Sequence, residues 1–382
     1  MFIRALTLKN VLSFRAPEPL ELGPLNILIG PNAAGKTNLL SCIELLQALP
    51  NSLNNYLNSR GGADAWVWKG AKSTQEPARL EYQFRIEPHS LNYQLAFASV
   101  ERALAVQEEM LSQSDYSYLT RRGVRLQVGS RGLPGVPDSE RETNIVPTQS
   151  VLETFRSPLD PTPITPTARA FGEIRIYGGF DTGTRSDARI GTSTGGSPKH
   201  PLEASGSNLA LALQEMDFQG SLAKVKEYLK RFSARFEDIK IRSEGGRSQV
   251  YVTERGVGRL SATNLSDGTL KFLCLMAVLF DDDPPPLVCI DEPEAGLHPD
   301  ALALVGSALR EASQRMQIVV ATHSDALVDQ FSDEPENIIV CERGSDEGTQ
   351  FSRLSRLQLR EWLQDYTLGD LWRRGEIGGM QR

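Results

Sequence analysis

The chain has 382 residues, of which 40% are hydrophobic, which is enough for a large core and for two or three domains. Its formal net charge of −7 excludes binding to polyanions by bulk electrostatics, so any nucleic-acid surface would have to be a local patch. The four cysteines form no CxxC pair, and no apolar run reaches the roughly 18 residues of a membrane span, so we expect a cytoplasmic protein with free thiols rather than disulfides or zinc.

The first unit that the sequence predicts is a strand, a loop and a helix. Leu25–Ile29 is a short apolar run typical of a strand, and a helix is predicted from about Lys36. The loop between them, GPNAAGKT, satisfies G-x-x-x-x-G-K-[ST], and its glycines let backbone N–H groups converge on phosphate oxygens beside a helix N-terminus. Lys36 would reach the β- and γ-phosphates and the Thr37 hydroxyl would ligate Mg²⁺. The residues predicted to bind phosphate groups here are Gly30, Asn32, Ala33, Ala34, Gly35, Lys36, Thr37 and Asn38.

The middle of the chain has weaker patterns. Residues 50–110 contain mixed strands, whereas residues 112–206 are rich in Ser, Gly, Pro and Thr, and the segment DPTPITPT predicts no regular structure. Two helices are predicted between Asn208 and Phe236. The second exposes several basic side chains, which form a solvated face more often than a DNA track. A hairpin is predicted around Gly245-Gly246.

The segment LSDGTLKF, from Leu265 to Phe272, precedes an apolar run with helical spacing. Ser266 or Asp267 can cap the first turn of that helix. By its residues alone, the segment is a helix start.

An acidic strand follows. Leu287–Ile290 predicts a buried strand that ends in Asp291-Glu292, where ligands of open α/β sheets bind. Asp291 would hold Mg²⁺, mostly through water, and Glu292 would act as the general base on the attacking water, with a solvated acidic turn as the alternative. A helix beginning at Pro299 leads to a neighbouring strand that ends in Thr322-His323, from which His323 could reach the γ-phosphate.

The order of these motifs, with EAGLHP after the acid pair, resembles the ABC-type ATPase heads of the RecF, SMC and OLD branch. The resemblance implies an α/β P-loop NTPase fold: an ABC-type ATPase head with a mixed-sheet core and a helical lobe that carries a signature motif. It identifies LSDGT as that signature, so Ser266 and Gly268 would close over the γ-phosphate held by a second copy. It also identifies Gln149, in PTQSVL, as the Q-loop glutamine that touches Mg²⁺ and the attacking water, with an ordinary loop amide as the alternative. Asp267 departs from the commonest motif, and its charge should weaken phosphate binding unless Lys271 or Mg²⁺ offsets it.

Five segments are expected on this basis. They are 1–110, the first part of the ATPase lobe with the P-loop; 111–206, an insertion with the Q-loop; 207–284, the helical signature lobe; 285–350, the second part of the ATPase lobe; and 351–382, a helical tail.

Two features of related proteins are expected to be absent, which restricts the group of ATPases that the chain resembles. No heptads join Gln149 to Ser266, which excludes long SMC-type arms, and the 59 residues after His323 leave no room for a Toprim nuclease. The resemblance therefore implies a stand-alone prokaryotic defence-type ATPase, in which an ATP-sandwiched homodimer gates a separate effector, such as a small Toprim-like or nuclease protein, in phage defence. A RecF-like repair ATPase that binds DNA directly is the alternative, and a transporter subunit is disfavoured by EAGLHP. The tail, with Trp362 and Trp372, is expected to pack on the head rather than to dock a partner.

Overall fold

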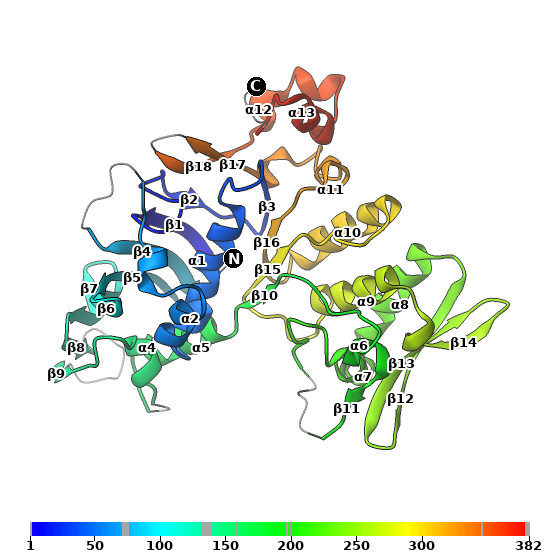
Figure 1. Ribbon diagram of the computed structural model, residues 1–382, viewed down its shortest axis with the longest axis horizontal. Helices are drawn as coiled ribbons and strands as arrows, with labels where there is room; N and C mark the ends of the chain where they lie inside the picture. Colours follow the sequence, from blue (N-terminus) through cyan, green and yellow to red (C-terminus); the bar gives the residue numbers. More distant parts are fainter. Residues whose placement is uncertain are drawn as a thin grey trace. The chain divides into compact units, whose positions relative to one another are not determined.

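The computed structural model describes residues 2–70, 76–130, 140–157, 159–195, 198, 200–344 and 347–378 (Figure 1). The chain divides into two compact units. Unit 1 comprises Met1–Arg175, Glu336–Ser355 and Gly375–Arg382, and unit 2 comprises Ile176–Pro335 and Arg356–Arg374. The strand β10 (Arg175–Tyr177) lies at their boundary.

Unit 1 is built around an eight-stranded antiparallel sheet in the order β2-β1-β4-β5-β6-β7-β8-β9. Its elements are β1 (Ile3–Lys9), β2 (Leu20–Glu21), β3 (Leu25–Ile29), α1 (Lys36–Ala48), α2 (Leu53–Ser59), α3 (Ala63–Trp66), β4 (Ala78–Ile86), β5 (His89–Val100), β6 (Ala103–Gln113), β7 (Tyr116–Arg122), β8 (Arg125–Gly129), β9 (Glu140–Asn144), α4 (Val151–Thr154), α5 (Ile164–Gly172), β17 (Ile338–Gly344) and β18 (Gly348–Arg353). Burial alternates along β4, which gives the sheet one apolar face. Phe171 of α5 packs on that face, with its ring against those of Phe84 and Tyr93.

A second group of strands in unit 1 carries the P-loop. β3 is buried along its whole length and pairs in parallel with β17, which pairs antiparallel with β18. This mixed pairing agrees with the mixed sheet expected from the sequence. The predicted bounds of β3 and the predicted start of α1 at Lys36 are both confirmed.

The expectation that DPTPITPT forms no regular structure is wrong, because α5 begins inside it at Ile164. Pro163 lies at the N-cap and Pro166 in the first turn, where a backbone N–H has no partner within the helix and proline costs little. The carboxylate of Asp160 organises this start by accepting hydrogen bonds from Thr162 and Thr165. Regular strands and helices also occupy much of residues 112–206, since β7, β8 and β9 are successive antiparallel neighbours.

Unit 2 combines helices with a small antiparallel sheet in the order β11-β13-β12, in which β14 also pairs with β13. Its elements are α6 (Asp187–Ile190), β11 (Thr192–Ser193), α7 (Leu209–Gln219), α8 (Leu222–Phe232), β12 (Phe236–Glu244), β13 (Arg247–Glu254), β14 (Gly258–Ser261), η1 (Ala262–Asn264), α9 (Asp267–Leu279), β15 (Leu287–Asp291), α10 (Pro299–Ala312), β16 (Gln317–Ala321), α11 (Asp325–Asp329), α12 (Arg356–Leu359), η3 (Trp362–Gln364) and α13 (Leu368–Arg374), and η2 (Pro335–Asn337) spans the second boundary. The hairpin predicted at Gly245-Gly246 joins β12 to β13.

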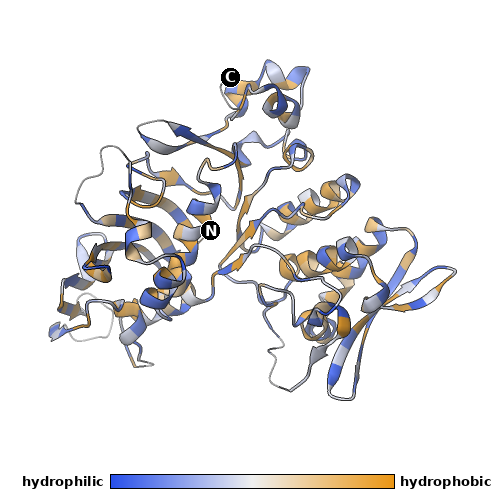
Figure 2. Ribbon diagram, in the orientation of Figure 1, coloured by the Kyte–Doolittle hydropathy of each residue, from blue (hydrophilic) through white to orange (hydrophobic). Residues whose placement is uncertain are grey.

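The core of unit 2 surrounds α9, which is buried from Thr269 to Leu279 with the exception of Lys271 and is apolar around most of its surface (Figure 2). The ring of Phe272 stacks on Phe232 of α8 at 4.4 Å. β15 and β16 are apolar strands that pair in parallel. Such continuous apolar runs are typical of strands covered on both faces.

The tail packs on unit 2, as expected, through α13. The backbone N–H groups of Leu368 and Gly369 donate to Ser332 Oγ and Asp329 Oδ1, at 3.0 and 2.7 Å. Trp362 remains 43% exposed, so α13 rather than this tryptophan makes the contact. No helix in the described ranges has the length and apolar character that crossing a membrane requires.

Candidate nucleotide-binding and hydrolysis site

The P-loop conformation depends on glycines at two close approaches. Gly30 has a φ of 144°, and a Cβ there would lie 2.2 Å from the carbonyl oxygen of Cys341. Gly35 has a φ of 105°, and a Cβ there would lie 2.4 Å from Thr349 Oγ1. The loop is therefore pressed against β17 and β18, and larger side chains at either glycine would displace it.

Lys36 is the first residue of α1 and is only 5% exposed. Its Nζ donates to the carbonyl oxygens of Gly30 and Pro31, at 2.8 and 3.2 Å, so the side chain lies back over the loop. Thr37 is exposed in the same turn, and that turn contains no acidic side chain. A lysine ammonium and a helix N-terminus with no carboxylate in its first turn fit a polyphosphate.

The backbone around Gln149 is held by a buried ion pair that the sequence did not reveal. Arg121 donates to the carbonyl oxygens of Gln149 and Val146, and its Nη1 lies 3.5 Å from Glu109 Oε2. Glu109 in turn accepts from the backbone N–H of Val151. Both charged side chains are fully buried, and burial lowers the pKa of Arg121 although Glu109 opposes that shift. The only available sequence signal was two opposite charges at inward positions of β6 and β7.

The side chain of Gln149 itself is half-buried, and its Nε2 donates to Glu153 Oε1 at 3.4 Å. Its role toward Mg²⁺ and water stays a prediction.

The predicted acid pair and histidine meet in unit 2. Asp291 is the last residue of β15 and is in register with Ala321, the last residue of β16. The neighbouring strands therefore present Asp291-Glu292 and Thr322-His323 at the same edge, as the sequence predicted. Glu292 Oε1 lies 4.0 Å from His323 Nε2. Glu292 also has a φ of 51°, a strained conformation for a non-glycine residue that is often found at functional sites.

Glu294 is a third carboxylate at this edge, and the sequence reasoning missed it. Its Oε1 accepts from the Thr322 hydroxyl at 2.7 Å and from the His323 backbone N–H at 2.8 Å. Its Oε2 is buried without a hydrogen-bond partner among the described residues. Glu294 therefore fixes the start of the turn that carries His323. The available signal was the second glutamate of DEPEAGLHP.

The signature segment forms the predicted cap. Ser266 Oγ accepts from the backbone N–H of Thr269 at 3.1 Å and caps the 13-residue helix α9. Gly268 lies against the loop that follows Glu294, since a Cβ there would lie 3.0 Å from the carbonyl oxygen of Gly296. A larger residue at position 268 would therefore displace that loop.

The charge of Asp267 is offset differently from the expectation. Its carboxylate pairs with Arg189 of α6 at 2.5 Å, whereas the Nζ of Lys271 donates to the carbonyl oxygen of Ala295. The sequence reasoning missed Arg189 because 78 residues separate it from Asp267.

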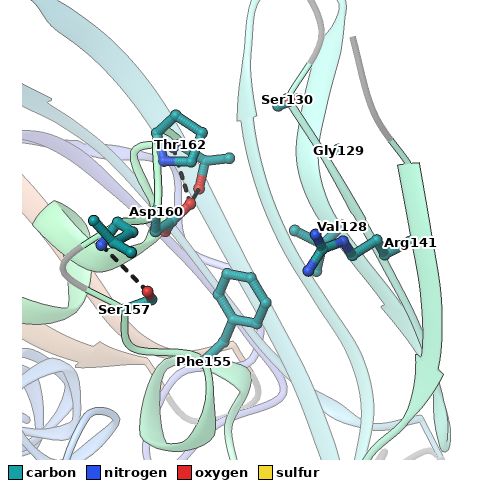
Figure 3. Close-up of a pocket in the computed structure, with 10 residues that line it drawn as sticks. Val128, Gly129, Ser130, Arg141, Phe155, Ser157, Asp160 and Thr162 are labelled. Carbon is teal, nitrogen blue, oxygen red and sulfur yellow. Dashed lines mark hydrogen bonds between the residues drawn. The ribbon is translucent and has the colours of Figure 1, made fainter. Parts of the chain in front are cut away.

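The predicted site residues thus fall into two groups. Unit 1 contains the P-loop and Gln149, and unit 2 contains Asp291, Glu292, His323 and the signature residues. A pocket of about 450 Å³ in unit 1, shown in Figure 3, is lined by other residues, including Val128, Arg141, Phe155 and Thr162. It contains no residue predicted for the nucleotide site.

A family model described as "AAA domain, putative AbiEii toxin, Type IV TA system" matches residues 25–123 and 197–329. No curated protein matches the chain.

Solved structures with a similar fold include heads of SMC proteins. They include an Smc head bound to the C-terminal winged-helix domain of ScpA, with 13% identity, a TM-score of 0.58, and coverage of 94% of this chain and 100% of that one. The SMC head domain from Thermotoga maritima has 15% identity, a TM-score of 0.50 and coverage of 93% and 100%. An Smc head with an extended coiled coil, bound to the C-terminal domain of ScpA derived from Pyrococcus furiosus, has 14% identity, a TM-score of 0.53 and coverage of 95% and 99%. The chain therefore belongs to this AAA-domain family, and it has the α/β fold of an ABC-type ATPase head.

Proposed function

We propose that the chain hydrolyses ATP, with the P-loop binding phosphate groups and the strand edge that carries Asp291, Glu292 and His323 supplying the hydrolytic groups. The observation that carries this proposal is the 4.0 Å approach of Glu292 and His323 at the ends of two parallel strands. A carboxylate and an imidazole in this arrangement suit a general base and a γ-phosphate contact.

Each residue then has one task. Lys36 and the backbone N–H groups of the P-loop hold the β- and γ-phosphates, and Thr37 and Asp291 would hold Mg²⁺. Bound Mg²⁺ would supply charge neutralisation on the phosphate oxygens. Glu292 accepts the proton of the attacking water, and His323 donates a hydrogen bond to the γ-phosphate. Gln149 would contact Mg²⁺ and the attacking water.

We further propose that the active form is a homodimer in which two ATP molecules are sandwiched between the copies. Two features support this. Ser266 and Gly268 lie at the N-terminus of α9, which suits an anion, and they belong to unit 2, whereas Lys36 belongs to unit 1. The fold is also that of SMC heads. Ser266 and Gly268 of one copy would thus contact the γ-phosphate bound by the other.

The proposed role of this dimer is to gate a separate effector, such as a Toprim-like or nuclease protein, in phage defence. The family description, which names a toxin of a type IV TA system, supports a role within a multi-component system. The basic residues of α8 give little support to direct DNA binding, because Lys224 pairs with Glu311 and Lys226 pairs with Asp238. A direct DNA binder would lose affinity steeply as salt rises.

A mixing experiment tests the composite site. Lys36→Ala abolishes nucleotide binding, and Ser266→Arg leaves ATP binding to the monomer intact but blocks closure, so neither variant hydrolyses ATP alone. In the mixed dimer, one site combines both defects and the other combines an intact P-loop with an intact signature. Activity should return on mixing. If both sites must turn over together, ATP-dependent dimerisation of the mixture should return instead.

The result that contradicts the proposal is the absence of both signals while circular dichroism shows that each variant is folded. LSDGT would then be only the start of α9. Normal ATP affinity in Lys36→Ala would contradict the P-loop assignment itself.

A further inference from the structure

We propose that Arg189 is a positioning residue for the signature: it fixes the segment before α9, so that Ser266 and Gly268 can meet the phosphate of a second copy. This inference rests on the proposed function and adds a residue to it. Arg189 lies in the short helix α6, to which the sequence analysis assigned no role in hydrolysis.

The guanidinium of Arg189 is almost wholly occupied by the segment that it would hold. Its Nη1 lies 3.3 Å from the carbonyl oxygen of Ala262 and 2.7 Å from that of Leu265, and its Nη2 donates to Asp267 Oδ1. Its Nε donates to the carbonyl oxygen of Thr182 at 3.0 Å. The buried side chain of Arg189 therefore hydrogen-bonds to the residues before and after Ser266, which are Leu265 and Asp267. Arg189 is 7% exposed, so little solvent competes for these bonds.

The helix that carries Arg189 is itself anchored to the small sheet of unit 2. Arg247 of β13 pairs with Asp187 at 2.9 Å and donates to the carbonyl oxygen of Gly191. Gln249 of the same strand donates to the carbonyl oxygen of Arg189 at 3.3 Å. A helix of four residues has marginal stability by itself, so these contacts hold the backbone of Arg189 in place.

The ion pair between Arg189 and Asp267 also reduces the negative charge at the start of α9. Asp267 stands in the first turn of α9, and its side chain is 68% exposed. Unpaired, this carboxylate would repel an approaching phosphate at close range. Arg189 neutralises it, whereas Lys271 is directed to the loop at Ala295. Arg189 therefore reduces the negative charge that an anion would meet at the N-terminus of α9.

Arg189→Lys is the most informative variant, because it keeps the positive charge but lacks the planar guanidinium group that reaches several acceptors. We expect hydrolysis to fall roughly tenfold or more, as for the loss of charged hydrogen bonds, while ATP binding to the monomer changes less than about twofold. Arg189→Ala should lower hydrolysis further. The matched control is Arg185→Ala, since Arg185 is an exposed arginine in the same segment. It should hydrolyse ATP like the unmodified protein.

A mixing experiment separates positioning of the signature from a general loss of structure. Arg189→Lys and Arg189→Ala are each mixed with Lys36→Ala. The mixed dimer has one site with an intact P-loop and an intact signature, so activity should exceed that of either variant alone. A defect within the variant's own P-loop site would not be relieved in this way.

The Ser266→Arg and Lys36→Ala mixture serves as the reference. If that reference recovers but the Arg189 mixtures do not, the inference is wrong and the proposed function stands. If the reference recovers neither activity nor ATP-dependent dimerisation, the composite site is wrong. Arg189→Lys hydrolysing ATP at the normal rate would also overturn the inference. Thermal unfolding is measured first, and Arg189→Lys carries the test if Arg189→Ala does not fold.

Discussion

The hydroxyl of Thr349 donates a hydrogen bond to the carbonyl oxygen of Ala34 at 2.8 Å, although 315 residues separate the two along the chain. The same oxygen of Thr349 hydrogen-bonds with Ser13 Oγ at 2.9 Å, and Thr349 is fully buried. The P-loop is thus held by β18 and by the segment after β1, and not only by its own strand and helix.

Replacing Thr349 by valine should weaken ATP binding while the protein stays folded. The variant keeps the side-chain volume but leaves the Ala34 carbonyl without its donor, which costs about 1–3 kcal/mol in a buried site and allows the loop to relax. We expect the Kd for ATP to rise about tenfold in calorimetric titrations. Thr349→Ser is the control, because it keeps the hydroxyl. Equal affinity in the valine variant would show that β18 does not set the loop conformation.

Glu292→Gln should bind ATP normally but hydrolyse it slower by roughly 10² or more, because a positioned base supplies about that factor. The amide keeps the size of the side chain and its approach to His323 but cannot accept the proton of water. ATP should then hold the dimer together in size-exclusion chromatography. An unchanged turnover rate would assign the base to another residue.

The parts of the fold that could be predicted from sequence are those with local signals. A short, mostly apolar run followed by GPNAAGKT predicts β3, the loop and the start of α1, and Ser266 before an apolar helical pattern predicts the cap of α9. The proximity of Asp291 and His323 could also be predicted from the sequence. A strand–helix–strand order places the two parallel strands side by side in the sheet.

The contacts that position these motifs could not be predicted. Thr349, Arg189 and the Glu109–Arg121 pair act on segments far away in the sequence, and each looks like an ordinary polar residue in its own neighbourhood. The start of α5 was missed for a different reason. Closely spaced prolines predict irregular structure, whereas Pro163 and Pro166 occupy the end of a helix where they are tolerated.

Glu294→Ala should slow hydrolysis without weakening ATP binding. Glu294 Oε1 accepts from both the Thr322 hydroxyl and the His323 backbone N–H, so its removal leaves two donors unpaired and frees the turn that carries His323. We expect kcat to fall roughly tenfold or more, as for a lost hydrogen bond to a charged group. Glu294→Gln keeps the accepting oxygen and should recover most of the rate in a steady-state ATPase assay. If alanine and glutamine behave alike, the two hydrogen bonds do not position His323.

Stability should fall at alkaline pH because of buried thiols. Burial raises the pKa of Cys42 and Cys274 well above the ordinary thiol value and that of Cys341 to about 12, while Lys36 lowers the last slightly. The unfolded chain loses these protons near pH 8.5, whereas the folded chain keeps them. The folded state then binds more protons, so the free energy of unfolding must decrease as pH rises above about 8.5, by up to about 1.4 kcal/mol per pH unit for each such thiol. Urea unfolding at pH 7, 9 and 10 under reducing conditions measures this slope.

Cys274→Ala should reduce the slope by the contribution of one thiol, even though the cavity that it leaves lowers stability at every pH. All four cysteines are buried, so native protein should also resist a thiol reagent that labels all four in denaturant. A slope that Cys274→Ala leaves unchanged would mean that Cys274 ionises equally in the folded and unfolded chains.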